Sequence, residues 1–202
     1  MTTNEKQNDL IEKALGDCDV FSSDIPAIDL YVDQILSLLS EKIASGSEPY
    51  RDKLLTKTMI NNYSKDGLLS PIKGKKYSKE QIIQMLLIYF LKGTLSMGEI
   101  SRYFDELYKK EQFSASELVS FYDEFVADKE NMRDLCRDTV NNIIDSKKPN
   151  AMETVNTKDT LSVIMSLLCV SAYLKTTATL LFDECCPEST SPENDKKKEK
   201  KK

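Results

Sequence analysis

The sequence contains no histidine, and this absence excludes several kinds of site at once. Ser-His-Asp and Cys-His catalytic arrangements, histidine-ligated metals and the usual pH switch all depend on an imidazole. The glycine-rich loops that hold phosphates, GxGxxG and GxxxxGKS or GxxxxGKT, are also absent. We therefore expect no enzymatic activity, no catalytic residue, no cofactor and no metal site.

The cysteines lack the spacing of metal-binding or redox motifs. They are odd in number and none is arranged as CxxC; they are Cys18, Cys136, Cys169, Cys185 and Cys186. The last two are adjacent, as in soft-metal sites, but no third ligand accompanies them. The first ten residues, MTTNEKQNDL, contain no apolar run typical of a secretory signal. These features predict a cytoplasmic protein with free thiols.

Glycine and proline are scarce, at six residues each, whereas leucine, isoleucine, lysine and glutamate are abundant. This composition favours an all-α protein with at most one small hairpin. From Asp24 the apolar residues Ile28, Val32, Ile35 and Leu39 recur at helical spacing, which predicts a helix ending near Ala44. Three capping boxes open later helices, at Ser78 with Gln81, Ser96 with Glu99, and Ser114 with Glu117.

The central feature is a basic block on an acidic chain. Residues 51–79 carry eight basic and two acidic side chains, a net charge of +6, while the whole chain carries −5. The remainder therefore sums to −11. A local positive block marks where a polyanion such as nucleic acid could bind.

This block divides into a short helix and a hairpin. Thr56 is a suitable N-cap, Met59, Ile60 and Tyr63 share one face, and Gly67 is placed to end the helix. The outward positions are Lys57, Thr58, Asn61, Asn62 and Lys65. The following residues turn around Gly74 as a predicted β-ribbon, whose tip carries Lys73, Lys75 and Lys76.

The second half of the chain reads as helices. The apolar pattern of residues 115–145 predicts two helices, or one broken near Asp128, and that of residues 158–183 predicts a last helix. That helix has 14 uncharged residues before Lys175, fewer than the roughly 20 of a membrane span. We expect it to pack or dimerise, with a membrane anchor as the alternative. The low-complexity residues after Asp183 are expected to be disordered.

The order of these elements resembles the winged helix-turn-helix of MerR-type regulators. There, as here, a short helix ends in Gly-Leu-Leu, a wing closes on Tyr, and a helix opens with Ser. The strings LTKTMINNYSKDGLL, KKYSKEQI and LYVDQIL more closely resemble a family of predicted bacterial regulators, a domain of unknown function sometimes called YkrK-like. That similarity covers about residues 24–110. The Arg-Tyr-Tyr triplet usual in MerR recognition helices is replaced by Asn61-Asn62-Tyr63.

The resemblance implies an all-α fold with a small β-hairpin wing, a MerR-like winged helix-turn-helix followed by a C-terminal helical region. We expect a flexible segment at 1–24, a DNA-binding domain at 25–110, a dimerisation or effector region at 111–183 and a disordered tail at 184–202. The implied function is a sequence-specific transcriptional regulator that binds double-stranded DNA as a homodimer, without a membrane, through recognition helix 56–66 and wing 70–77. The alternative is a protein-interaction module that keeps this fold without binding DNA.

The candidate DNA-binding residues share the outward face of the short helix or the wing. Asparagine can form two hydrogen bonds to one adenine, so Asn61 and Asn62 are the candidates for base recognition. Lysines contact phosphates, which fix position but do not read sequence. Tyr63 is interpreted first as a core residue and second as a DNA contact. The candidate set is Lys57, Thr58, Asn61, Asn62, Tyr63, Lys65, Lys73, Lys75 and Lys76.

Overall fold

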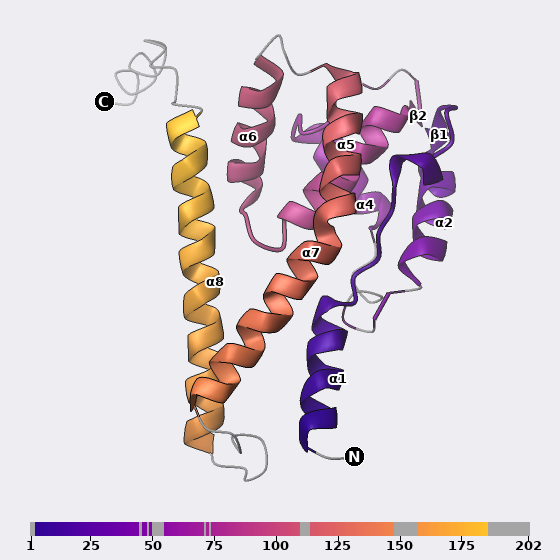
Figure 1. Ribbon diagram of the computed structural model, residues 1–202. Helices are drawn as coiled ribbons and strands as arrows, with labels where there is room; N and C mark the ends of the chain where they lie inside the picture. The colour runs from indigo at the N-terminus through magenta and orange to yellow at the C-terminus, as the bar shows by residue number, and fades with distance from the viewer. Residues whose placement is uncertain are drawn as a thin grey trace. The chain divides into compact units, whose positions relative to one another are not determined.

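The computed structural model describes residues 3–44, 46–47, 49, 55–70, 72, 74–109, 114–147 and 157–185. The chain divides into two compact units, residues 1–167 and 168–202. Figure 1 shows the elements, which are mostly helical with one two-stranded antiparallel sheet, so the mostly helical prediction is confirmed. In the first unit they are α1 (Thr3–Leu15), the 3-10 turn η1 (Ser22–Asp24), β1 (Leu30–Tyr31), α2 (Val32–Ile43), α4 (Lys57–Lys65), β2 (Lys76–Tyr77), α5 (Lys79–Leu91), α6 (Met97–Lys109) and α7 (Ala115–Lys147). Helix α8 (Thr157–Cys185) begins in the first unit and continues into the second.

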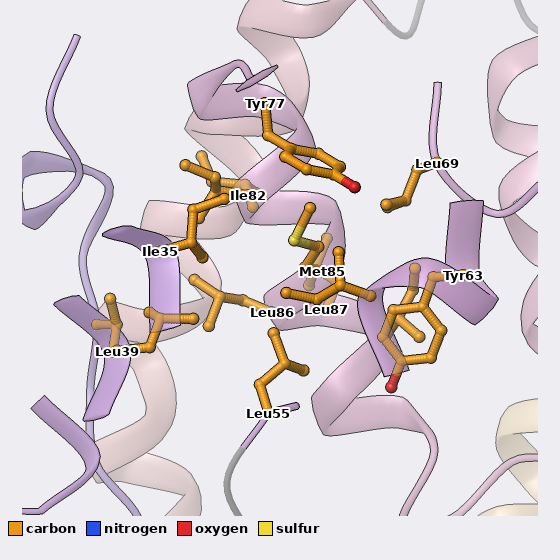
Figure 2. Close-up of a cluster of buried hydrophobic side chains, with 14 of the residues drawn as sticks. Ile35, Leu39, Leu55, Tyr63, Leu69, Tyr77, Ile82, Met85, Leu86 and Leu87 are labelled. Atoms are coloured by element: carbon orange, nitrogen blue, oxygen red, sulfur yellow. The ribbon is translucent and has the colours of Figure 1, made fainter. Parts of the chain in front are cut away.

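Helix α5 is the centre of the core. The predicted capping box forms, because the Ser78 hydroxyl accepts from the backbone N–H of Gln81 while the Gln81 side chain accepts from Ser78 N–H. Every residue from Gln81 to Ile88 is buried. Figure 2 shows side chains of several elements meeting around this helix, among them Ile35, Leu39, Tyr63 and Tyr77. The almost continuously apolar sequence of α5 is therefore explained by neighbours on nearly every side.

The small sheet joins two segments that are distant in the sequence. β1 and β2 are antiparallel, with Leu30 opposite Tyr77 and Tyr31 opposite Lys76. The sequence predicted a β-ribbon whose two strands pair with each other across Gly74. The described strand, β2, pairs with β1 instead. A two-residue strand cannot be stable alone, and β1 supplies the backbone partner that it needs.

This pairing also corrects the start of the preceding helix. The helix expected from Asp24 begins instead at Val32, because Leu30 and Tyr31 are extended and paired in the sheet. Ile28, assigned to the apolar stripe of that helix, is 69% exposed. The later members of the stripe, Ile35 and Leu39, are buried as expected.

Helix α7 is continuous over 33 residues, so the break considered near Asp128 does not occur. Its predicted cap forms, with the Ser114 hydroxyl accepting from Glu117 N–H and the Glu117 carboxylate accepting from Ser114 N–H. The box that opens α6 forms in the same way between Ser96 and Glu99. The capping boxes therefore predicted the starts of α6 and α7 correctly.

Residues 3–24, which belong to the segment expected to be flexible, instead run antiparallel along α7 (Figure 1). Gln7 donates to Asn141, Arg137 pairs with Glu12, Lys129 donates to the Cys18 carbonyl, and the Tyr122 hydroxyl donates to the Val20 carbonyl. Ser22 then donates twice to Asp123, at 2.8 and 2.5 Å. We call residues 3–24 the N-terminal strap. These partners on α7 lie more than 100 residues away along the chain, so no local pattern could have revealed them.

Gly67 should be the more costly of two glycines to replace with alanine. Its φ is +73°, a left-handed conformation, whereas Gly98 in α6 has no positive φ, and an added Cβ would meet nothing within 4 Å at either position. We expect Gly67→Ala to lose about 1 kcal/mol of unfolding free energy from backbone strain alone. Gly98→Ala should gain roughly 0.5–1 kcal/mol from helix propensity. Urea unfolding measures both, and a shift of the same sign in the two variants would contradict this account.

Candidate functional site

Helix α4 is short and held at both ends. The Thr56 hydroxyl accepts from the Met59 backbone N–H at 3.2 Å, which confirms the predicted N-cap. After Asp66 the chain turns through Gly67, and the Leu68 N–H donates to the Tyr63 carbonyl at 2.9 Å. Leu68 and Leu69 are buried directly after the turn. Both ends are therefore fixed in place.

One face of α4 is locked into the core, with Ile60 fully buried and Tyr63 4% exposed. The opposite face carries the predicted outward residues, all of which are exposed; they are Lys57, Thr58, Asn61, Asn62 and Lys65. Because the buried face fixes the rotation of the helix, the two adjacent asparagine side chains lie in solvent. The helix thus presents amide and ammonium groups on a rigid support.

Lys57 has an acidic neighbour. Its ammonium lies 3.4 Å from Asp33 at the start of α2, and both side chains are well exposed. An exposed pair of this kind contributes little stability. Lys57 can therefore exchange this partner for another anion at small cost.

The described part of the wing lies next to α4. The Tyr77 hydroxyl is 3.5 Å from the Ser64 hydroxyl, which joins the end of β2 to the last turn of the helix. Lys75 and Lys76 are exposed, and the Lys76 ammonium lies 5.0 Å from the centre of the Tyr31 ring. Lys73 lies outside the described residues. Lys65 and Lys76 are therefore the sequence neighbours of the two residues, Ser64 and Tyr77, that join α4 to the wing.

Tyr63 does not lie on this exposed surface, although it was among the DNA-contact candidates. Its side chain is buried, and its hydroxyl has no hydrogen-bond partner among the described residues. Burial, with a contribution from Tyr89, raises the pKa of this hydroxyl. Tyr63 follows Met59 and Ile60 at helical spacing, and that spacing, which favours the core, decided its position.

Two buried glutamines position the chain between α4 and the wing. The side chain of Gln81 donates to the Ser70 carbonyl at 2.9 Å, and that of Gln84 accepts from the Ser70 N–H at 3.2 Å. Gln84 also donates to the Tyr108 hydroxyl of α6. The sequence pattern predicted only a capping role for Gln81 and no role for Gln84. The available signal was two amides, three residues apart, inside an otherwise apolar helix.

These observations define a class: a mostly helical protein with a capped helix, polar on its exposed side, supported by a buried helix and a two-stranded sheet. Residues 20–125, more than half of the chain, match the family described as domain of unknown function (DUF1836). The chain belongs to that family. The matched region includes α4, β2, α5 and α6, whereas α8 lies beyond it. No match was found among curated proteins or among solved structures.

Proposed function

We propose that this protein is a sequence-specific DNA-binding regulator of transcription, in which α4 is the recognition helix and residues 70–77 form the wing. The observation that carries the proposal is the pair of exposed asparagines on a helix whose other face is immobilised in the core. Asparagine is a poor helix former, so helix stability does not account for two in succession. A bidentate contact to adenine accounts for them, because the major groove exposes N6 and N7 of that base.

The lysines support the same proposal. Lys57 and Lys65 flank the asparagines on α4, and Lys75 and Lys76 lie on the adjacent wing. In this position they would bind phosphates on either side of the groove and fix the register of the helix. Because the rest of the chain is acidic, DNA should be repelled from other surfaces and bind at this face.

The order of elements supports a MerR-like, YkrK-like relationship. A short strand precedes α2, α4 follows, and a second strand returns beside the first before the capped helix α5. We propose that this order corresponds to a winged helix-turn-helix, in which the segment leading into the first helix of the motif anchors the wing strand. On this functional analogy α4, rather than α2, would enter the groove.

We also propose that the protein binds DNA as a homodimer in the cytoplasm. A recognition helix of nine residues makes a small footprint, and two copies on a two-fold site would double it. Helix α8 offers apolar surface for such a contact, since Leu161, Ile164, Met165 and Leu168 are all exposed. By length and composition the stretch Lys158–Cys185 could also cross a membrane, and its most apolar window is not buried. A second copy and a lipid bilayer are therefore the competing occupants of this surface.

Selection from random double-stranded DNA with the full-length protein tests the proposal. We expect one enriched motif that contains adenine and is repeated with two-fold symmetry, as a dimer requires. Fluorescence anisotropy on that site should give a slope of log K against log salt of roughly −4 to −5, from about four to six phosphate contacts. Failure to enrich any motif would refute the DNA proposal and favour an acidic protein as the partner of this basic face. An enriched motif without symmetry would refute the dimer alone.

A further inference from the structure

A cavity of about 370 Å³ lies within the first unit, away from the exposed face of α4. Its walls come from the end of α5 through Thr94, Ile43 of α2, the middle of α7 and the Asp17–Val20 part of the N-terminal strap. Most of the lining is apolar, including Leu86, Leu87, Tyr122 and Val126. At its edge Phe90 is half exposed and packs against Phe125, with ring centres 5.1 Å apart. The cavity has the size and lining of a site for a small, largely hydrophobic molecule.

Two lysines, Lys92 and Lys129, line this cavity, and they differ in how their charge is balanced. Lys129 lies 2.5 Å from Asp17 and 2.7 Å from Asp19, so its charge is compensated. Lys92 has no carboxylate partner among the residues that the structure describes. Its ammonium instead lies 4.7 Å from the centre of the Tyr89 ring and 3.7 Å from the Met59 sulfur.

A cation against an apolar wall is unfavourable unless an anion accompanies it. Burial lowers the pKa of Lys92. The aromatic ring and the thioether offer only weak electrostatic compensation. A carboxylate entering the cavity would supply the negative charge that the described residues do not place beside Lys92.

We propose that this cavity binds a small amphipathic monocarboxylate, with its carboxylate on the Lys92 ammonium and its hydrocarbon part among the apolar residues of α5 and α7. A neutral molecule of the same shape would leave Lys92 uncompensated, and a cation would be repelled. The lining thus selects for one negative charge attached to an apolar body.

The site is connected to the candidate recognition helix through one side chain. Met59 belongs to α4, and its sulfur is one of the two groups that Lys92 contacts. A carboxylate that draws Lys92 into the cavity removes this contact from beneath α4. This regulatory consequence rests on the proposed function, whereas ligand binding itself does not.

Isothermal titration calorimetry on the full-length protein without DNA tests the site, with decanoate as the probe, below its micelle-forming concentration. We expect saturable 1:1 binding of decanoate and at least about tenfold weaker binding of 1-decanol, because a charge-assisted contact is lost. Lys92→Met should weaken the binding of decanoate by a similar factor, and Lys92→Arg should retain most of the affinity. Lys79→Met, at the opposite end of the same helix, removes an equal charge and should leave binding unchanged.

The connection to α4 has a separate readout. With ¹³C-methyl-labelled methionine, decanoate should shift the Met59 resonance in the wild type but not in Lys92→Met, and Met59→Leu assigns the signal. Absence of decanoate binding, equal binding of decanol, or unchanged affinity in Lys92→Met would each overturn the site. Binding without a shift of Met59 would overturn the link to α4. Because neither measurement involves DNA, these results stand apart from the outcome of the DNA selection.

Discussion

Replacing both Asn61 and Asn62 with alanine should remove most of the preference of this protein for its selected DNA sequence. A bidentate contact between asparagine and adenine discriminates by about 1–3 kcal/mol, which is roughly a five- to 150-fold loss of specific over non-specific affinity. The fold should survive, because both side chains are exposed. Alanine is also the better helix former, so the melting temperature should stay the same or rise slightly. Anisotropy with the selected and a scrambled duplex measures the ratio of affinities directly.

The wing lysines provide the contrasting variants. Lys75→Ala and Lys76→Ala should weaken binding to both duplexes equally, and each should reduce the salt slope by about one. Lys147→Ala removes the same charge from an exposed position in the last turn of α7 and should leave the slope unchanged. If the double asparagine variant keeps its full preference for the selected duplex, α4 does not read bases in the manner proposed.

The parts of the fold that follow from the sequence are those decided within a few residues. Thr56 and Ser78 cap helices because each hydroxyl reaches a backbone N–H three residues on, and both contacts are present. Gly67 ends α4 because it adopts a positive φ, at +73°. Such features depend on local geometry, and so the starts of α4 and α5 could be predicted.

The pairing of β1 with β2 could not be predicted in this way. Leu30 and Tyr77 are 47 positions apart, and two-residue strands carry no alternating pattern. The assignment of Ile28 to a helix failed for the same reason, because tertiary pairing of the next residues overrode helical spacing. Of the candidate site, the exposure of Asn61, Asn62 and their lysine neighbours followed from periodicity. The cavity at Lys92 did not, since its walls come from four separate segments.

The contacts of the N-terminal strap with α7 are the largest difference from expectation. The contribution of its ion pairs to the free energy of unfolding can be measured. Arg133 lies 3.0 Å from Asp17 and 2.6 Å from Asp19, and its side chain is only 14% exposed. Arg133→Ala should lower the free energy of unfolding by about 2 kcal/mol, somewhat less than the cost for fully buried pairs because these groups keep some solvent. Arg137→Ala is the matched control, because Arg137 pairs with Glu12 of the same strap but is more exposed, and its loss should be much smaller.

The loss of unfolding free energy in Arg133→Ala should depend on pH, and this dependence separates the contribution of charge from that of packing. Burial tends to raise the pKa of Asp19, but the hydrogen bonds from Arg133 and Lys129 outweigh it, so the pKa lies below its ordinary value. Stability from a lowered carboxyl pKa is fully present above the ordinary pKa and disappears as the pH falls through the folded value. The gap in unfolding free energy between wild type and Arg133→Ala, measured by urea titration, should therefore be largest near neutrality and shrink below about pH 4. A gap that stays constant down to pH 2.5 would mean that Arg133 stabilises the strap by packing of its aliphatic stem rather than by its charge.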